Sequence, residues 1–371
     1  MAMIKIFLMR HARPDFPLEE RYCLGQSDMP LGKIGHMQGC LLKAFWQEKS
    51  IPVFSSPLKR AKETADYIAS DNQPITIVQD LKELNAGLWD GYSFTEIKQK
   101  WPELYAKRSS AFASDLIPGA EDHHTGQKRF MKAIGQVIQN ISDGETEIAI
   151  VAHATVIQLL LADILSCPMA DIKKYKLPYA GWVSLIYDEG ELSFQAGPFE
   201  ARPKLSDDLC LDLLRTADCP INVIRHCQKV ADAATEIGRQ LNEKKFPLDL
   251  NLLRESAYLH DMLRLEKNHE KATADWLDFL GYPNHAKIIA EHNTAQNEIA
   301  INESSLLYIA DKITQNDQIV ALQKRFDLSF SKCLTAEAKA AHLKRKNYAF
   351  ALSAQINKII GRKVIDDNVK F

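Results

Sequence analysis

Two histidines in the first half of the chain each follow a short apolar segment. Arg10 and His11 come after residues 4–9, and His153 comes directly after residues 147–152. Both segments have the composition of β-strands, and in parallel α/β sheets ligands bind at the edge formed by the carboxyl ends of the strands. An imidazole placed there can act as a nucleophile. An Arg-His pair at a strand end is also common in ordinary loops, so these positions alone leave both interpretations open.

A third segment, residues 55–61, could complete an anion site at the same edge. Ser56 is suited to cap a helix, Pro57 suits the first helical position, and Arg60 falls in the first turn. A helix that starts in this way directs backbone N–H groups, together with a guanidinium group, toward an anion. The alternative is a well-capped helix with no ligand.

The second half of the chain contains a different combination, of histidines and aspartates. His226, His260, Asp261 and Asp311 lie in separate segments with helical periodicity. His260 and Asp261 end an apolar helical pattern, where burying them would be costly unless they coordinate something. Imidazoles and carboxylates that converge from several helices form metal sites. The alternative is a set of polar core residues that satisfy one another.

The elements expected to position these residues divide the chain into two domains. In the first, strands alternate with helices, which predicts an α/β domain with a mostly parallel sheet flanked by helices and a hairpin at its edge. The expected strands are residues 4–9, 52–55, 75–78, 147–152, 181–188 and 192–196, and the expected helices are 56–69, 122–141 and 154–165. The second domain is expected to be all-α, with helices at residues 221–241, 249–262, 269–280, 285–292, 304–313 and 336–360. We predict domains at 1–198 and 219–371, joined by a linker at 199–218.

Composition limits the classes of partner. The chain has 371 residues, about two domains, and a formal net charge of −2, which argues against nucleic acid and acidic membrane surfaces. Its seven scattered cysteines contain no C-x-x-C pair, and we expect reduced thiols in the cytoplasm. The longest apolar segment, residues 148–165, contains His153, Gln158 and Asp163, so no transmembrane helix is expected. Residues 3–9 are interpreted as a first strand rather than a secretion signal.

Five ordered segments, residues 8–12, 25–31, 55–61, 81–91 and 151–153, resemble the histidine phosphatase superfamily over about residues 1–197. The similarity is to the phosphoglycerate mutase-like branch, nearest the α-ribazole phosphatase type. It implies that His11 forms a phosphohistidine, that Arg10, Arg60 and His153 hold the phosphoryl oxygens, and that Glu83 is the general acid. No cofactor is implied for this domain. A phosphatase is favoured, and a phosphomutase stays open.

Substrate-binding residues follow from the same resemblance, with two departures. The family commonly has Gly after the nucleophile and Ser or Thr, then Asn, shortly afterwards, whereas this chain has Ala12, Pro14 and Pro17. Arg13 could compensate by binding phosphate. Other substrate-binding candidates come from segments that recognise substrate in the family, although packing is the simpler interpretation for any single one: Gln26, Trp89, Tyr92, Trp101, Tyr105, His123 and His124.

The order His226, His260-Asp261, Asp311 resembles the HD-domain metal-dependent phosphohydrolase superfamily, over about residues 219–330. The resemblance implies one divalent ion on these four residues and a second ion, bridged by Asp261, on His269 and His292. His285 could replace His292. Lys312 either holds a phosphate or lies on a solvated helix face. The ion could be Fe, Mn, Ni, Co or Mg.

Together these observations predict a two-domain phosphohydrolase acting on small-molecule phosphate esters or nucleotides. The first domain is expected to be a phosphomonoesterase and the second a hydrolase of a nucleotide-like phosphate ester or anhydride, with the two acting in sequence on one molecule. The alternative from another class is a regulatory nucleotide-binding protein whose HD domain is not catalytic. The apolar stripe of residues 336–360 either covers the helical bundle or forms a homodimer contact, and the basic residues there are interpreted as a solvated face.

Overall fold

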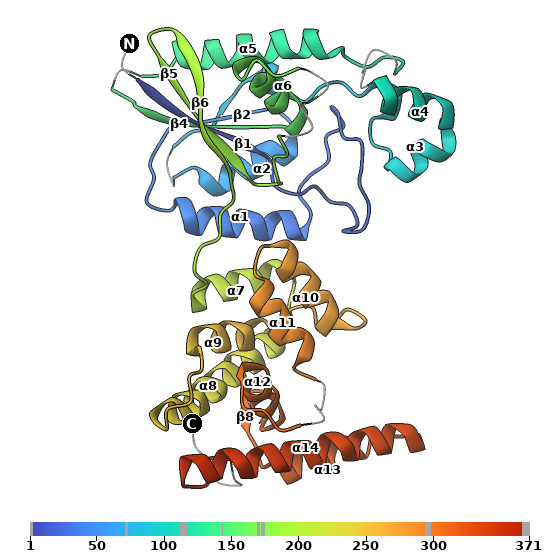
Figure 1. Cartoon of the computed structure of the whole chain (residues 1–371), viewed down its shortest axis with the longest axis vertical. Helices are drawn as coiled ribbons and strands as arrows, with labels where there is room; N and C mark the ends of the chain where they lie inside the picture. Colours follow the sequence, from blue (N-terminus) through green and yellow to red (C-terminus); the bar gives the residue numbers. More distant parts are fainter. Residues whose placement is uncertain are drawn as a thin grey trace. The chain divides into compact units, whose positions relative to one another are not determined.

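The computed structural model describes residues 3–70, 73–111, 117–142, 144–168, 171, 175–293 and 298–365. The chain divides into two compact units, Met1–Pro203 and Lys204–Phe371, each with its own secondary structure (Figure 1).

The first unit is built on a six-stranded sheet in the order β3-β2-β4-β1-β5-β6. Its strands are β1 (Ile4–Arg10), β2 (Val53–Ser55), β3 (Thr76–Ile77), β4 (Glu147–Ala152), β5 (Trp182–Asp188) and β6 (Glu191–Phe199). β1 to β4 are parallel, and β5 and β6 form an antiparallel hairpin at the edge. Arg10 pairs with Ala152, so His11 and His153 leave neighbouring strands at the same level. The predicted α/β fold and its edge hairpin are confirmed.

Helices cover both faces of this sheet because its strands are apolar on both sides. Ile4, Ile6 and Leu8 of β1 pack into one hydrophobic cluster, and Phe7 and Met9 into another. The first cluster includes side chains of α5 (His123–Gln139) and α6 (Ala154–Ile164), and the second those of α1 (Lys33–Trp46) and α2 (Lys59–Ile68). Figure 1 shows these two helix pairs on opposite faces of the sheet.

Helix α1 is absent from the sequence-based prediction because its glycines weaken the helical signal. The structure shows why glycine is needed there. A Cβ on Gly35 would lie 2.0 Å from the carbonyl oxygen of Arg13, and one on Gly39 would lie 2.3 Å from the ring of Tyr67. The helix therefore packs closely against the segment that follows His11. Two further helices, α3 (Phe94–Lys100) and α4 (Pro102–Ala111), and the short 3₁₀ turns η1 (Gln79–Leu81) and η2 (Gly87–Trp89) were also not predicted.

The second unit is a helical bundle, as predicted. Its helices are α7 (Asp207–Thr216), α8 (Ile221–Glu243), α9 (Leu250–Leu259), α10 (His269–Phe279), α11 (Pro283–Glu291), α12 (Glu303–Lys312), α13 (Leu322–Phe330) and α14 (Ala336–Ile360). α8 packs against both α9 and α12. α13 and a two-stranded hairpin, β7 (Thr314–Gln315) and β8 (Gln318–Ile319), add to the predicted elements. The expected linker contains α7, whose Asp207 accepts a 2.6 Å hydrogen bond from Arg254 of α9.

No helix in the described ranges combines the length and apolar character that crossing a membrane requires. All seven cysteines are described, and none forms a disulfide.

On α14, Lys339 and Lys344 are exposed, whereas Tyr348, Leu352 and Ile356 are buried. The apolar side of this helix therefore contributes to the interior of the second unit.

Candidate functional site

The first candidate site surrounds His11, and we call the group His11, Arg10, Arg60, Glu83 and His153 the His11 site. The side chain of His11 is buried, and its Nδ1 lies 2.7 Å from the carbonyl oxygen of Ala12. Nδ1 therefore carries the ring proton in the neutral form, which leaves the lone pair on Nε2. Burial, followed by the charges of Arg60 and Arg10, lowers the pKa of His11 well below its usual value of 6.5. The ring is therefore neutral near pH 7 and its Nε2 can act as a nucleophile.

Arg60 faces this lone pair from the first turn of α2, as the sequence predicted. It is fully buried, and its Nε lies 3.3 Å from His11 Nε2. The other two guanidinium nitrogens donate 2.7 Å hydrogen bonds to the carbonyl oxygens of Ser27 and Gly25. The carboxylate of Asp90 accepts the backbone N–H groups of the same loop, at residues 25 to 27. Asp90, which sequence reasoning missed, thus holds the loop of residues 25 to 27, and the carbonyl oxygens of that loop hold the Arg60 guanidinium.

Ser56 has a different role from the predicted one. Helix α2 begins at Lys59, and its N-cap residue, Leu58, makes no side-chain cap. The Oγ of Ser56 instead lies 2.7 Å from Nε2 of His153. The prediction of Ser56 as helix cap and Pro57 as first helical residue was therefore wrong, because the serine hydroxyl is used across the sheet edge.

Two buried polar atoms of the His11 site lack a hydrogen-bond partner among the described residues. They are Nδ1 of His153, whose side chain is fully buried, and Nε of Arg10. The rings of His11 and His153 lie 5.0 Å apart. Because buried polar atoms are costly when unpaired, and Arg10 Nε is a donor, their presence beside His11 is consistent with binding of an anion.

Tyr179 supports Arg10 and was not foreseen. The guanidinium of Arg10 lies 3.5 Å from the centroid of the Tyr179 ring, and its Nη1 donates a 2.7 Å hydrogen bond to the carbonyl oxygen of Leu177. The Tyr179 ring is also 5.7 Å from that of His11. These residues come from the loop before β5, which carries no periodic signal in the sequence.

The carboxylate of Glu83 lies at the N-terminal end of α6, where it accepts hydrogen bonds from backbone N–H groups of that helix. Its Oε2 accepts the backbone N–H of Thr155 at 3.0 Å, and Oε1 accepts those of Leu84 at 2.9 Å and Val156 at 3.3 Å. Burial raises the pKa of Glu83 above its usual value, although these hydrogen bonds and the charge of Arg60 act in the opposite direction. Glu83 therefore keeps a proton to higher pH than an exposed glutamate, as a general acid requires.

Of the predicted substrate-binding residues, Arg13 and Gln26 lie near the His11 site and contact protein groups. Arg13 is buried and donates to the carbonyl oxygens of Phe16 at 3.3 Å and Pro17 at 2.6 Å. Gln26 donates from Nε2 to the carbonyl oxygen of Glu83 at 3.1 Å. The structure therefore gives both side chains a loop-holding role, and direct contact with phosphate stays a prediction for them.

Trp89 requires a correction. Its indole is 1% exposed and packs with Ile97 and Ile117 in a small hydrophobic cluster, so it does not line an open mouth. The turn η2 directs this side chain inward. The position of Trp89 in a sequence motif gives no information on this direction. Tyr105 lies beside Trp89 at the edge of the same cluster. The remaining candidates have these surroundings: Tyr92 and Trp101 stack edge to face at the edge of the cluster, His123 is buried at the start of α5, and His124 is exposed.

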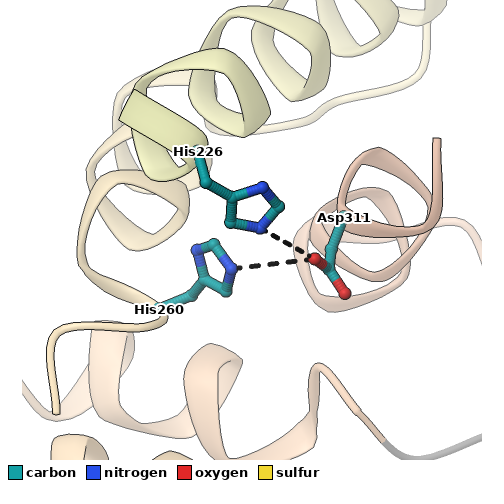
Figure 2. A group of neighbouring side chains, drawn as sticks. All are labelled: His226, His260 and Asp311. Atoms are coloured by element: carbon teal, nitrogen blue, oxygen red, sulfur yellow. Dashed lines mark hydrogen bonds and ion pairs between the residues drawn. The ribbon is translucent and has the colours of Figure 1, made fainter. Parts of the chain in front are cut away.

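The second candidate site, which we call the His260 cage, consists of His226, His260, Asp261, His292 and Asp311. Asp311 Oδ1 lies 3.1 Å from His226 Nε2 and 3.9 Å from His260 Nε2 (Figure 2). Asp261 Oδ2 lies 3.8 Å from His260 Nε2. Within the described ranges two triads bring possible ligand atoms within 4.8 Å of one another: His226, His260, Asp311 and His260, Asp261, His292.

All three histidines of the cage are oriented in the same way. In each, Nδ1 meets a backbone carbonyl oxygen, which fixes the proton on Nδ1 and leaves the Nε2 lone pair facing its neighbours. The partners are Asn316 for His226 at 2.9 Å, Ala257 for His260 at 2.8 Å and Ile289 for His292 at 2.6 Å. Nε2 of His260 is buried and makes no hydrogen bond to the described residues. Metal-binding histidines are typically oriented by such carbonyl contacts, so the donor set fits a divalent ion.

The protonation states of Asp311 and His292 suit metal binding, whereas Asp311 raises the pKa of His226. Burial raises the pKa of Asp311, but Lys312 and His226 outweigh this effect and hold the pKa well below its usual range. Burial lowers the pKa of His292 to about 4. Ionised carboxylates and neutral imidazoles are the forms that bind metal.

Outside the cage, the structure distinguishes the remaining predicted ligands. His285 Nε2 lies 2.7 Å from the carboxylate of Glu255, so His292 rather than His285 belongs to the cage. His269 Nε2 lies 3.0 Å from Asp261 Oδ1 but belongs to neither triad. Lys312 is 13% exposed at its side chain and donates to Asp311 Oδ2 at 2.6 Å and to Asn293 Oδ1 at 2.9 Å, so it is not on a solvated face. Asn293 was not foreseen.

Comparison with protein families identifies both regions. Residues 6–196 match the family model of the histidine phosphatase superfamily (branch 1), and residues 223–316 match the HD domain model.

Curated relatives align with the first region. The chain is 29% identical over 164 residues to the uncharacterized phosphatase PhoE of Bacillus subtilis, which covers 44% of this chain and 78% of that protein. It is 25% identical over 186 residues to the adenosylcobalamin/alpha-ribazole phosphatase of Escherichia coli, which covers 49% of this chain and 89% of that protein. It is also 25% identical over 183 residues to the 6-phosphofructo-2-kinase/fructose-2,6-bisphosphatase of Caenorhabditis elegans. That alignment covers 48% of this chain and only 38% of that protein. Among solved structures, the alpha-ribazole phosphatase of Shigella flexneri is similar with a TM-score of 0.48 and 21% identity, over 55% of this chain and 100% of that chain.

Proposed function

The chain belongs to the histidine phosphatase superfamily (branch 1) and carries an HD domain after it, and from this we propose that it hydrolyses phosphate esters at two separate sites. Both are families of hydrolases that act on phosphate esters. We propose that the first site removes a terminal phosphate through His11 and that the second, metal-dependent site hydrolyses a nucleotide-like phosphate ester or anhydride. The observation that carries the first proposal is the buried, neutral His11 with Arg60 on its Nε2 side.

At the first site, His11 Nε2 attacks phosphorus and the bond from phosphorus to the leaving oxygen breaks. Glu83 gives its proton to that oxygen, which departs as an alcohol, and the enzyme holds a phosphohistidine. Water then attacks the phosphorus while the Glu83 carboxylate takes the water's proton, releasing inorganic phosphate and restoring the neutral imidazole. Its raised pKa suits Glu83 to both proton transfers.

Two arginines and the neutral His153 of the site stabilise the transferring phosphoryl group. Arg60 beside His11 Nε2, and the unpaired donors Arg10 Nε and His153 Nδ1, would contact its oxygens. Such prearranged donors lower the energy of a transition state in which negative charge is spread over those oxygens. Tyr179 and Asp90 act indirectly, by holding Arg10 and the loop on which Arg60 rests.

At the second site, His226, His260, Asp261, His292 and Asp311 would hold the metal. A bound divalent ion supplies a Lewis acid and lowers the pKa of a coordinated water. The backbone carbonyl oxygens that contact Nδ1 of the three histidines would leave Nε2 to hold the ion, and Lys312, paired with Asp311, favours the ionised form of that carboxylate. Because both sites act on phosphate, we propose that the HD site releases a monoester that the His11 site dephosphorylates. The name of the Escherichia coli relative makes a nucleoside-like phosphate the first substrate class to try.

Phosphate release from a panel of phosphomonoesters and nucleotides, with and without a strong chelator, tests this proposal. Release at the His11 site should resist chelation, whereas hydrolysis at the His260 cage should stop and return with added metal. Loss of all phosphate release on chelation would contradict the role of His11. Nucleotide recovered intact after incubation with metal would contradict catalysis at the cage and favour a regulatory HD domain, and return of the phosphoryl group to the substrate skeleton would indicate a mutase.

A further inference from the structure

Arg264 occupies an unexpected position beside the His260 cage. Its Nη1 lies 2.8 Å from Nε2 of His269 and 3.4 Å from Oδ1 of Asp261. These two atoms are themselves 3.0 Å apart. The guanidinium therefore contacts both of the groups between which a second metal ion would have to bind.

A second ion at that position conflicts with Arg264 on grounds of charge. The guanidinium group of an arginine is a cation. A dication ligated by Asp261 Oδ1 and His269 Nε2 would have this positive charge as its direct neighbour. The contact from Arg264 also competes for the same carboxylate oxygen and ring nitrogen that the ion would need.

The histidine shared by the two triads leads to the same conclusion. His260 belongs both to the triad with His226 and Asp311 and to the triad with Asp261 and His292. Its Nδ1 is engaged by the carbonyl oxygen of Ala257, so it offers one lone pair, on Nε2. One lone pair binds one ion, so a second ion could not use His260 and would depend on Asp261 Oδ1 and His269 Nε2, the two atoms that Arg264 contacts.

We propose that the His260 cage binds a single divalent ion and that the guanidinium of Arg264 takes the place of a second ion. This inference rests on the proposed metal binding of the cage. It departs from the two-ion arrangement that the sequence resemblance implies, and it makes His269 a partner of Asp261 and Arg264 rather than a metal ligand.

The test is the number of ions bound by the full chain. The metal-free protein is titrated with Co²⁺, followed by its visible absorption, and the bound metal is measured after desalting. We expect one ion per chain in the wild type and two in Arg264→Ala. Lys271→Ala removes an exposed positive charge from the helix that carries His269, where Lys271 pairs with Asp275. This control should bind one ion.

Two further variants keep the proposal testable if Arg264→Ala does not fold. His269→Ala should still bind one ion, because His269 is not a ligand of it. Arg264→Gln should bind two ions, and adding His269→Ala to either Arg264 variant should return the count to one.

The outcomes separate this inference from the proposed function. Two ions in the wild type, one ion in a folded Arg264→Ala protein, or loss of the ion in His269→Ala would each overturn the inference and leave metal binding intact. No bound ion in the wild type would overturn the proposed metal site itself. Two ions in Lys271→Ala would show that any nearby charge has the effect, which contradicts a specific role for Arg264.

Discussion

The His11 site and the His260 cage both contain buried histidines, but the charges around those histidines are opposite. His11 faces Arg60 and Arg10, and burial together with these cations lowers its pKa well below the usual value. In the cage, burial lowers the pKa of His226, but the hydrogen bond and charge of Asp311, together with the Asn316 carbonyl and the charge of Asp261, raise the pKa overall. The first site therefore carries its own positive charge, whereas the second brings lone pairs and carboxylates together.

This difference indicates which ligand each site attracts. A neutral imidazole among arginines suits attack on a phosphoryl group whose negative charge the arginines stabilise. Imidazole lone pairs beside ionised aspartates suit a cation. A histidine at the end of a strand or helix is thus compatible with either chemistry, and its neighbours determine which one it performs.

Replacing His11 by Ala gives the largest expected effect and separates the two sites. We expect chelator-resistant phosphate release to fall by at least about 10³-fold, because removing a nucleophile abolishes the covalent route. Metal-dependent hydrolysis at the cage should be unchanged. The measurement is steady-state phosphate release with chelator present. Equal losses in both activities would break the comparison, because they would place the two reactions at one site.

Asp311→Ala should remove the activity of the cage and leave that of the His11 site. We expect metal affinity to fall by more than about 100-fold, because loss of partners that merely orient ligands already costs about 10- to 100-fold. Metal content and chelator-sensitive hydrolysis report the effect, and chelator-resistant release should be unaffected. His285→Ala is the matched control, since His285 pairs with Glu255 and should leave the metal in place. Metal loss in the control and retention in Asp311→Ala would contradict the assigned ligands.

Glu83→Gln should lower kcat/KM for the His11 site, which reports formation of the phosphohistidine, by about 10²- to 10³-fold, within the range of general acid catalysis. The loss should depend on the leaving group. Aryl phosphates, whose phenolate departs readily without a proton, should lose less activity than alkyl phosphates, whose alkoxide needs one. An equal loss on both kinds of substrate would contradict the role of Glu83 as general acid.

Strand composition sufficed to predict that His11 and His153 share one sheet edge, whereas Glu83 was predicted only from the resemblance to the histidine phosphatase superfamily. The strands before His11 and His153 are parallel neighbours, so a one-dimensional pattern correctly predicted which side chains meet. Trp89 shows the limit of this reasoning. Its motif is present, but the direction of the indole depends on the turn η2 and on packing with Ile97, neither of which a motif specifies.

In the cage, residue types predicted which side chains lie together but not their surroundings. His226, His260 and Asp311 meet as expected. Arg264 is a single basic residue in a turn, and its contact with His269 depends on where that turn directs a long side chain. Similarly, α1 escaped prediction because Gly35 and Gly39 serve close packing with Arg13 and Tyr67, at the expense of helix propensity.

The smallest expected effect concerns the pH dependence of the His11 site. Hydrogen bonds from Thr155 lower the pKa of Glu83, against the larger effect of burial. Thr155→Val removes the side-chain bond and keeps the backbone bond, so it should raise the pKa of Glu83 further. The protonated acid then persists to higher pH, and the alkaline limb of kcat/KM should move upward by less than about one pH unit, the size expected for one hydrogen bond.

The acid limb of the same profile should not move in Thr155→Val, because it reports protonation of His11, whose pKa depends on burial, Arg60 and Arg10. Thr235→Val, which makes the same chemical change in the second unit, where the hydroxyl bonds the Ala231 carbonyl oxygen, should leave both limbs in place. A shift of the acid limb, or a downward shift of the alkaline limb, would show that Glu83 is not the group that titrates there. An upward shift of the alkaline limb alone would sharpen the contrast with the cage, because it would show that protonation of the His11 site is set by its own side chains.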